Sequence, residues 1–254
     1  MNILWNAEKY KQNFSFVHQY GCDLLALIDF EKVKTAIDLG CGNGVLTASL
    51  KEKGIHVTGL DASPQQLETA KANYPDIPFQ LADATDFSVE ESVDLVFSNA
   101  VFHWIDHAKQ RDMLNCVSKA LRTGGQFVFE FGGYGNNALI HAALKEAFTK
   151  FNIPYINRFC FPSIGEYAPL VEQAGLRVKT ALLFDRLTEL KGPEGMRDWI
   201  DMFMKVPFEP VKDKQVAEQI KQQAIASLRP QLFIDGKWHA DYVRLRMKAI
   251  KEET

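Results

Sequence analysis

The stretch TAIDLGCGNGVL, residues 35–46, runs an apolar strand into three glycines at alternate positions and then into the start of a helix. Glycine at positions 40, 42 and 44 removes the Cβ atoms from one side of the turn, so a ligand can lie against the backbone amides. Asp38 stands at the end of the strand, where it would repel a pyrophosphate and attract the ammonium group of an amino-acid-like ligand. The stretch therefore predicts a ligand-binding turn in an α/β fold.

The same turn also resembles a dinucleotide-binding fingerprint, which leaves a nicotinamide-dependent oxidoreductase as an alternative. That fingerprint places its third glycine at the position held by Val45. Together with the acid at Asp38, this difference makes the nicotinamide interpretation the weaker one.

Composition limits the classes of function. The chain has 254 residues, of which 46% are apolar, enough for one large α/β domain or a domain with a cap. The formal net charge of −3 offers no basic stripe for nucleic acid. No apolar run approaches the roughly 20 residues that span a bilayer, and no signal peptide is visible. We therefore expect no membrane or nucleic-acid partner. The four cysteines are Cys22, Cys41, Cys116 and Cys160. Because no CxxC pair occurs among them, we expect no metal site, no disulfide framework and a cytoplasmic location.

From residue 35 onward, short β-branched runs alternate with helical periodicity, which is typical of βαβ units. Strands are predicted at 35–40, 56–61, 79–83, 93–99, 126–131, 176–187 and 241–250. The predicted helices cover 45–53, the segment after Ser63, 106–122, 136–150, a segment ending near Gly175, 193–204 and 211–228; Gly124 and Gly125 are expected to stop the third. The pattern predicts a doubly wound sheet.

The predicted organisation is one continuous domain in three parts. Residues 1–34 form an N-terminal helical lid, and residues 35–133 form the ligand-binding α/β core. Residues 134–254 complete the sheet, with a helical cap inserted near residues 188–240.

Two further acids follow predicted strands. Asp61, in VTGLDASP, lies where such folds place a carboxylate for ribose hydroxyls, although an Asp before Ser-Pro could instead support the start of the next helix. Asp83, in FQLADATDF, could accept from the exocyclic amine of an adenine or be a surface acid in a polar turn. Because ligands of open α/β sheets bind at the carboxyl ends of strands, Asp38, Asp61 and Asp83 together indicate an adenosine-containing ligand.

The fourth strand runs into SNAVFHWIDH, residues 98–107, which we expect to face the reactive end of the ligand. At least one of Phe102 and Trp104 should pack in the core. His103 could be a base, a donor to the substrate, or a helix-start residue satisfied by backbone. His107 is expected to be solvated.

These motifs, in this order, resemble the seven-stranded, class I family of S-adenosylmethionine-dependent methyltransferases over residues 35–133. IDLGCGNG resembles the first motif of the family, GLDAS its ribose acid, ADATD its adenine acid and LVFSNAVFHW its segment after strand four. The resemblance implies a Rossmann-like, mostly parallel sheet of seven strands with one antiparallel strand and a helical cap. It implies S-adenosyl-L-methionine as the cofactor, S-adenosyl-L-homocysteine as its product, and no metal.

By the same likeness, the glycines would border the methionine moiety, Asp61 would bind ribose, Asp83 adenine N6, and Asn99 would lie near the methionine amino group. The full predicted cofactor-binding set is Tyr10, Asp38, Gly40, Cys41, Gly42, Gly44, Asp61, Ala62, Asp83, Ala84 and Asn99.

Three segments, WNAEKYKQNFSFV, NAVFHW and DYVRLRMKA, look like the trans-aconitate methyltransferase group, whose members esterify small carboxylic acids. The likeness implies that Trp5 and Tyr10 belong to a lid near the cofactor, unless they only attach the first helix to the core. Trp5, His103 and Trp104 are the predicted substrate-binding residues. The chain is also similar to methyltransferases that esterify a malonyl group on a carrier protein, so the motifs do not name the acceptor.

The expected function is methyl transfer to a small, acidic molecule, with a non-catalytic S-adenosylmethionine-binding protein as a further alternative. A carboxylate acceptor is ionised at neutral pH and needs no base. A hydroxyl or acidic carbon would make His103 the candidate catalytic base. Arginines of the second half could orient an acidic substrate, but the sequence does not choose among them, nor between a monomer and a dimer.

Overall fold

The computed structural model describes residues 23–253, which form two compact units. The first takes residues 23–134, 159–183 and 244–253, and the second takes 135–158 and 184–243. The predicted insert near 188–240 thus falls in the second unit, together with residues 135–158, which the sequence had suggested would stay with the sheet. Trp5 and Tyr10 lie outside the described residues, as does most of the predicted lid.

A doubly wound sheet forms the first unit, in the strand order β3-β2-β1-β4-β5-β8-β6. Strands β1 to β5 are parallel, and β8 pairs antiparallel with β5, which confirms the predicted fold class. The eighth strand of the sheet, the short β7, pairs with β8. The strands are β1 (Thr35–Leu39), β2 (His56–Asp61), β3 (Phe79–Leu81), β4 (Val93–Asn99), β5 (Leu121–Gly132), β6 (Leu176–Glu189), β7 (Phe233–Ile234) and β8 (Lys237–Lys251).

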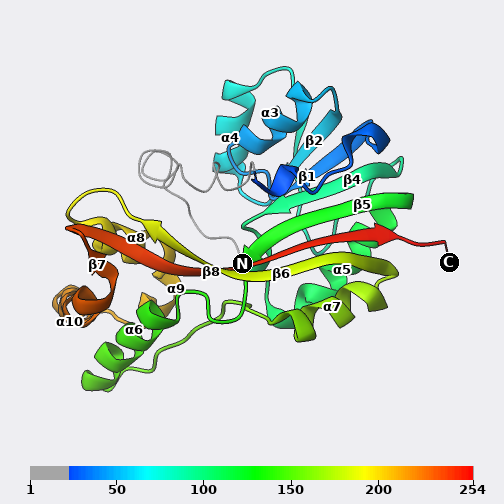
Figure 1. The fold of residues 1–254 in the computed structure, drawn as a ribbon. Helices are drawn as coiled ribbons and strands as arrows, with labels where there is room; N and C mark the ends of the chain where they lie inside the picture. Colours follow the sequence, from blue (N-terminus) through cyan, green and yellow to red (C-terminus); the bar gives the residue numbers. More distant parts are fainter. Residues whose placement is uncertain (1–22, 254) are drawn as a thin grey trace. The chain divides into compact units, whose positions relative to one another are not determined.

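Helices cover both faces of this sheet (Figure 1). On one face, α3 (Val45–Glu52) and α4 (Pro64–Asn73) pack on a core that includes Val128 of β5. On the other face, α5 (Gln110–Ala120) and α7 (Ile164–Gln173) pack on Phe127, Phe129 and Phe131 of the same strand. The alternation along β5 follows from the two-residue period of a strand. Short 3-10 turns are η1 (Phe30–Lys32), η2 (Phe102–Trp104) and η3 (His107–Lys109).

The second unit is mainly helical. Its longest helix packs against α6 through a stripe of buried residues at helical spacing, Ile220, Ala224 and Leu228. The helices of the unit are α6 (Ala138–Lys150), α8 (Gly195–Phe203), α9 (Lys205–Phe208) and α10 (Lys214–Leu232). Among residues 23–253, no helix combines the length and the apolar character needed to cross a membrane.

The predicted third helix was wrong at its end. It stops at Ala120, and Gly124 and Gly125 lie inside β5, which begins at Leu121. The pairing register between β4 and β5 shifts at this point, opposite Val93 and Leu95. A Cβ atom on Gly125 would lie 2.8 Å from the carbonyl oxygen of Arg122, so the glycine serves a bend in the strand rather than a helix stop.

Gln110, the first residue of α5, fixes the turn that follows β4. Its buried Nε2 donates to the carbonyl oxygens of Phe102, at 2.9 Å, and Ile105, at 3.0 Å. Its Oε1 accepts from the hydroxyl of Tyr167 on α7, at 2.9 Å. These bonds satisfy backbone carbonyl groups in and after the short 3-10 turn η2, and they hold the backbone around His103 in place.

We therefore expect Gln110→Met to lower the free energy of unfolding by about 1–3 kcal/mol, because buried polar groups lose their partners. Tyr167→Phe, which removes one hydroxyl from the same network, should cost about 1 kcal/mol. Urea unfolding followed by circular dichroism measures both. Equal stability of Gln110→Met and the wild type would contradict this role.

Candidate active site

Most of the predicted site residues in the described chain meet at one edge of the sheet. The order β3-β2-β1-β4 places the carboxyl ends of four parallel strands side by side. Asp38 lies near the end of β1, Asp61 and Asn99 end β2 and β4, and Asp83 follows β3. This is the edge at which ligands bind in doubly wound folds.

The glycine turn is attached to β2. The amides of Gly40 and Cys41 both donate to the carbonyl oxygen of Leu60, at 2.7 and 3.0 Å. The amide of Gly42 donates to Oδ2 of Asp61, at 2.8 Å. Gly44, with φ of 83°, ends the turn as the N-cap of α3.

The three glycines have different surroundings. A Cβ on Gly40 would lie 2.2 Å from Cγ2 of Val101, and one on Gly44 would lie 2.8 Å from Cζ of Phe79. Among residues 23–253, no atom lies within 4 Å of a Cβ built on Gly42, so the turn is open at Gly42 toward the described part of the chain. The neighbouring Asn43 is buried, and its Oδ1 accepts no hydrogen bond among the described residues. An open backbone and a buried acceptor suit a ligand that brings a hydrogen-bond donor.

Asp61 joins the turn to the next helix. Its Oδ2 takes the Gly42 amide, and its Oδ1 accepts from the amide of Ser63 at 2.8 Å. Ser63 is the N-cap of α4, so Asp61 does support the start of that helix. Each carboxylate oxygen has a second acceptor position, so ribose binding stays compatible with them. Burial raises the pKa of Asp61, and the backbone hydrogen bonds oppose that shift.

Asp38 is buried, with an exposed fraction of 2%. Its Oδ2 accepts from the hydroxyl of Thr47 on α3 at 2.6 Å, a partner that sequence reasoning missed. Burial raises the pKa of Asp38 to about 7, and the negative charge of Asp61 adds to the rise against the effect of the Thr47 hydrogen bond. A cationic group next to Asp38 would favour its ionised form.

The end of β3, where the adenine is predicted to bind, is more exposed than the glycine turn. Asp83 is exposed, and its Oδ1 accepts from the amide and the hydroxyl of Thr85, both at 2.8 Å. The first of these bonds is the main cause of a lowered pKa. Its adenine role stays a prediction. Ala84 packs partly against the core, and Ala62 lies half-buried between β2 and α4.

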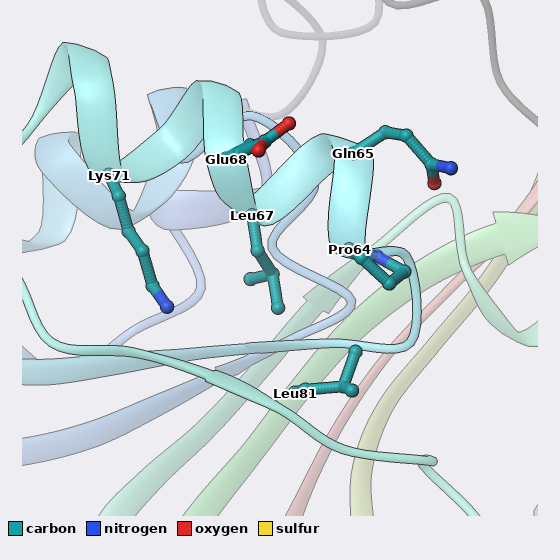
Figure 2. A pocket seen from close by; sticks show the side chains of 6 residues that line it. All are labelled: Pro64, Gln65, Leu67, Glu68, Lys71 and Leu81. Atoms are coloured by element: carbon teal, nitrogen blue, oxygen red, sulfur yellow. The ribbon is translucent and has the colours of Figure 1, made fainter.

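A pocket of about 340 Å³ lies next to this side (Figure 2). It is formed by the first turns of α4 and the end of β3, and no predicted site residue lines it. Its lining residues are Pro64, Gln65, Leu67, Glu68, Lys71 and Leu81.

The segment after β4 begins with a strained residue, since Ala100 has φ of 62°. Phe102 follows and is buried against Phe127, Phe129 and Phe131, so the core interpretation of Phe102 was correct. Trp104 is half-buried and lies edge-on to Phe159, with ring centroids 4.9 Å apart.

His103 is buried in the 3-10 turn η2. Its Nδ1 accepts from the amide of Gly132, the last residue of β5, at 3.3 Å. Burial holds the pKa of His103 well below its usual value, and the positive charge of Arg244 lowers it further. The ring is therefore neutral with its proton on Nε2, which leaves Nε2–H as a hydrogen-bond donor. His107 is exposed, and its Nδ1 lies 3.5 Å from Sγ of Cys160.

Known proteins are similar to this chain in sequence. Residues 36–125 match the family model of a methyltransferase domain. An uncharacterized methyltransferase of Schizosaccharomyces pombe is 35% identical over 98% of this chain and 98% of its own length. A trans-aconitate 2-methyltransferase of Methylobacterium radiotolerans is 40% identical over 41% of each chain. The trans-aconitate 2-methyltransferase of Escherichia coli is 28% identical over 68% of this chain and 69% of its own length.

Solved structures agree in fold. A protein of Bacillus halodurans described as a methyltransferase matches with a TM-score of 0.65 at 16% identity, over 92% of this chain and all of its own. A phosphoethanolamine N-methyltransferase of Haemonchus contortus, solved with S-adenosylhomocysteine, matches with a TM-score of 0.60 at 15% identity, over 97% of this chain and 57% of its own.

The fold and the relatives are those of a methyltransferase enzyme. The chain belongs to the class I, S-adenosylmethionine-dependent methyltransferase family, close to the trans-aconitate methyltransferase group. This decides against the nicotinamide-dependent oxidoreductase.

The raised pKa of Asp38 predicts a pH-dependent cost to stability. Between its ordinary pKa of 3.8 and about 7, the folded state keeps a proton that the unfolded state releases, so this residue lowers stability as pH rises. Asp38→Asn removes the effect and should be the more stable protein above pH 7, by at most about 4 kcal/mol. The two proteins should converge below pH 4. Urea unfolding from pH 4 to pH 8 measures the difference, and parallel profiles would contradict the shift.

The glycines predict two different defects. Gly40→Ala should lower the free energy of unfolding by about 2–4 kcal/mol, because the methyl group meets Val101 in addition to the strain of a positive φ. Gly42→Ala has strain alone and should lose about 1 kcal/mol. Its methyl group would instead occupy the open side of the turn and weaken S-adenosylmethionine binding, measured by calorimetry.

The double variant Gly40→Ala with Val101→Ala is the control for the steric explanation, and it should recover part of the lost stability. If Gly42→Ala binds S-adenosylmethionine as tightly as the wild type, the ligand does not use the open side of the turn.

Proposed function

We propose that this methyltransferase transfers the methyl group of S-adenosylmethionine to a carboxylate oxygen of a small acid, forming a methyl ester. The observation that carries the proposal is the hydrogen bond from Gly132 to Nδ1 of His103. It occupies the lone pair that a base would need and leaves Nε2 as a donor. A carboxylate needs no base, since it is ionised at neutral pH, whereas a hydroxyl acceptor would need one.

The residues of the carboxyl edge fit the cofactor. Asp38 can take the ammonium of its methionine part, and the open turn at Gly42 admits the ligand next to the buried oxygen of Asn43. Asp61 and Asp83 would take the ribose and the adenine, with Cys41, Ala62, Ala84 and Asn99 around them; these assignments rest on the resemblance and on the position of each residue at the edge of the sheet. The trans-aconitate relatives support a small acid as acceptor.

The cofactor supplies a methyl group that is already activated by a sulfonium. The protein then has to orient the acceptor and exclude water. Nε2–H of His103 can hold one carboxylate oxygen, and the aromatic rings of Trp104 and Phe159 beside it provide an apolar wall. In this proposal His103 fixes the direction of attack and carries no proton away.

Variants at His103 separate a donor from a base. His103→Ala should keep its affinity for S-adenosylmethionine and lose about 100-fold in kcat/KM, as expected when one positioned donor is removed. His103→Gln can accept from the Gly132 amide through Oε1 and donate through Nε2, so it should stay within about tenfold of the wild type. Mass spectrometry with labelled S-adenosylmethionine and a panel of carboxylic acids, phenols and acyl-carrier substrates gives both rate and product.

A labelled ester together with an active His103→Gln enzyme supports the proposal. A methyl ether or C-methyl product, or a His103→Gln enzyme as inactive as His103→Ala, would show that a base is needed and would overturn it.

A further inference from the structure

A buried ion cluster connects β5 with β8 at the same edge of the sheet. Glu130 of β5 is buried, with 1% of its surface exposed, and both of its carboxylate oxygens accept from arginines. Nε of Arg244 lies 3.1 Å from Oε1, and Nε of Arg246 lies 2.7 Å from Oε2. Glu130 and Arg244 are buried and Arg246 is half-buried, and burying such charges is costly, whereas a merely structural contact could be made by apolar residues at lower cost. The cluster therefore calls for a functional explanation.

Strand pairing places Arg244 opposite Gly132, the residue that contacts His103. In the antiparallel register, Arg246 is opposite Glu130 and Arg244 is opposite Gly132. Gly132 is also the residue whose amide donates to Nδ1 of His103. His103 and Arg244 thus flank the last residue of β5 from its two sides, and Arg244 is close enough for its charge to lower the pKa of His103.

Several other arginines that the sequence left open have partners of their own. Arg177 pairs with Glu252, and both are exposed. Arg197 pairs with Glu218, and Arg229 lies 4.0 Å from the ring centroid of Phe233, both in the second unit. Arg186 lies 5.0 Å from the ring centroid of Phe184. Arg246 contacts Glu130 two register positions farther from the strand end than Arg244.

A guanidinium placed here has a restricted use in ester formation. The reacting carboxylate loses its charge when it is methylated, so a cation bound to it would stabilise the substrate more than the transition state and slow the reaction. A neutral donor such as His103 orients that carboxylate and slows the reaction little. A cation helps when it binds a second carboxylate that keeps its charge throughout.

We propose that Arg244, oriented by Glu130, binds a non-reacting carboxylate of the acceptor and so selects di- and tricarboxylic acids over monocarboxylic ones. This inference rests on the proposed function, because it presumes that the reacting group is a carboxylate next to His103. Arg244 would act in specificity and binding, and Glu130 is a positioning residue behind it.

Fumarate and crotonate test the proposal, since they differ only in a carboxylate that replaces a methyl group. In the presence of S-adenosylhomocysteine, calorimetry or thermal shift should show that the wild type binds fumarate and trans-aconitate more tightly than crotonate. Arg244→Gln should lose that preference by about 10- to 100-fold, the loss expected for a hydrogen-bonded ion pair. The rates of ester formation should change through KM with little change in kcat, in contrast to His103→Ala.

Three further variants control the interpretation. Arg177→Gln removes an arginine from an exposed pair and should keep the preference. Arg244→Lys keeps the charge and should keep part of the preference. Glu130→Gln keeps Arg244 but loosens its orientation, and should also weaken the preference, so the test remains available if Arg244→Gln is unstable by urea unfolding.

The two proposals fail in different ways. If the wild type forms esters but binds fumarate and crotonate alike, or if Arg244→Gln keeps the wild-type preference, the role of Arg244 is overturned and the esterification stands. If no carboxylic acid of the panel yields an ester, the proposed function fails as well.

Discussion

The carboxylate of Asp61 is the contact on which the candidate cofactor site depends. It accepts one amide from the glycine turn after β1 and one from the start of α4 after β2. Both amides belong to segments that would otherwise leave donors unpaired, and one half-buried carboxylate accepts from both. The turn can therefore stay open at Gly42 while its backbone is held on both sides. The same carboxylate remains able to accept from a ribose.

Gly132, at the end of β5, connects two groups of the candidate acceptor site, as Asp61 connects two segments of the candidate cofactor site. Its amide sets the tautomer of His103, and its backbone pairs with Arg244 in the β5–β8 register. A neutral donor and a charged donor thus flank one strand end. Their different charges suit two different tasks, because a neutral group can hold a carboxylate that reacts and a cation can hold one that does not.

The local parts of this fold could be predicted from the sequence. The glycine turn, the strand ends with Asp38 and Asp61, and the start of α4 at Ser63 and Pro64 are short-range patterns, in which side-chain size and capping chemistry decide the backbone. Gly124 and Gly125 show the limit of such reasoning. A glycine pair after a helical pattern fits a helix stop and a bend in a strand equally well, and only the register between β4 and β5 decides between them.

The sequence by itself determined the class of the sheet and the family and indicated the candidate ligand-binding edge, because these follow from periodicity and from motifs of adjacent residues. Only the tertiary structure decided which polar groups meet. Thr47 reaches Asp38 because α3 packs above β1. Arg244 reaches Glu130, 114 residues away, because β8 enters the sheet antiparallel in one register. A shift of one residue would turn that arginine to the opposite face, and no local pattern fixes such a register.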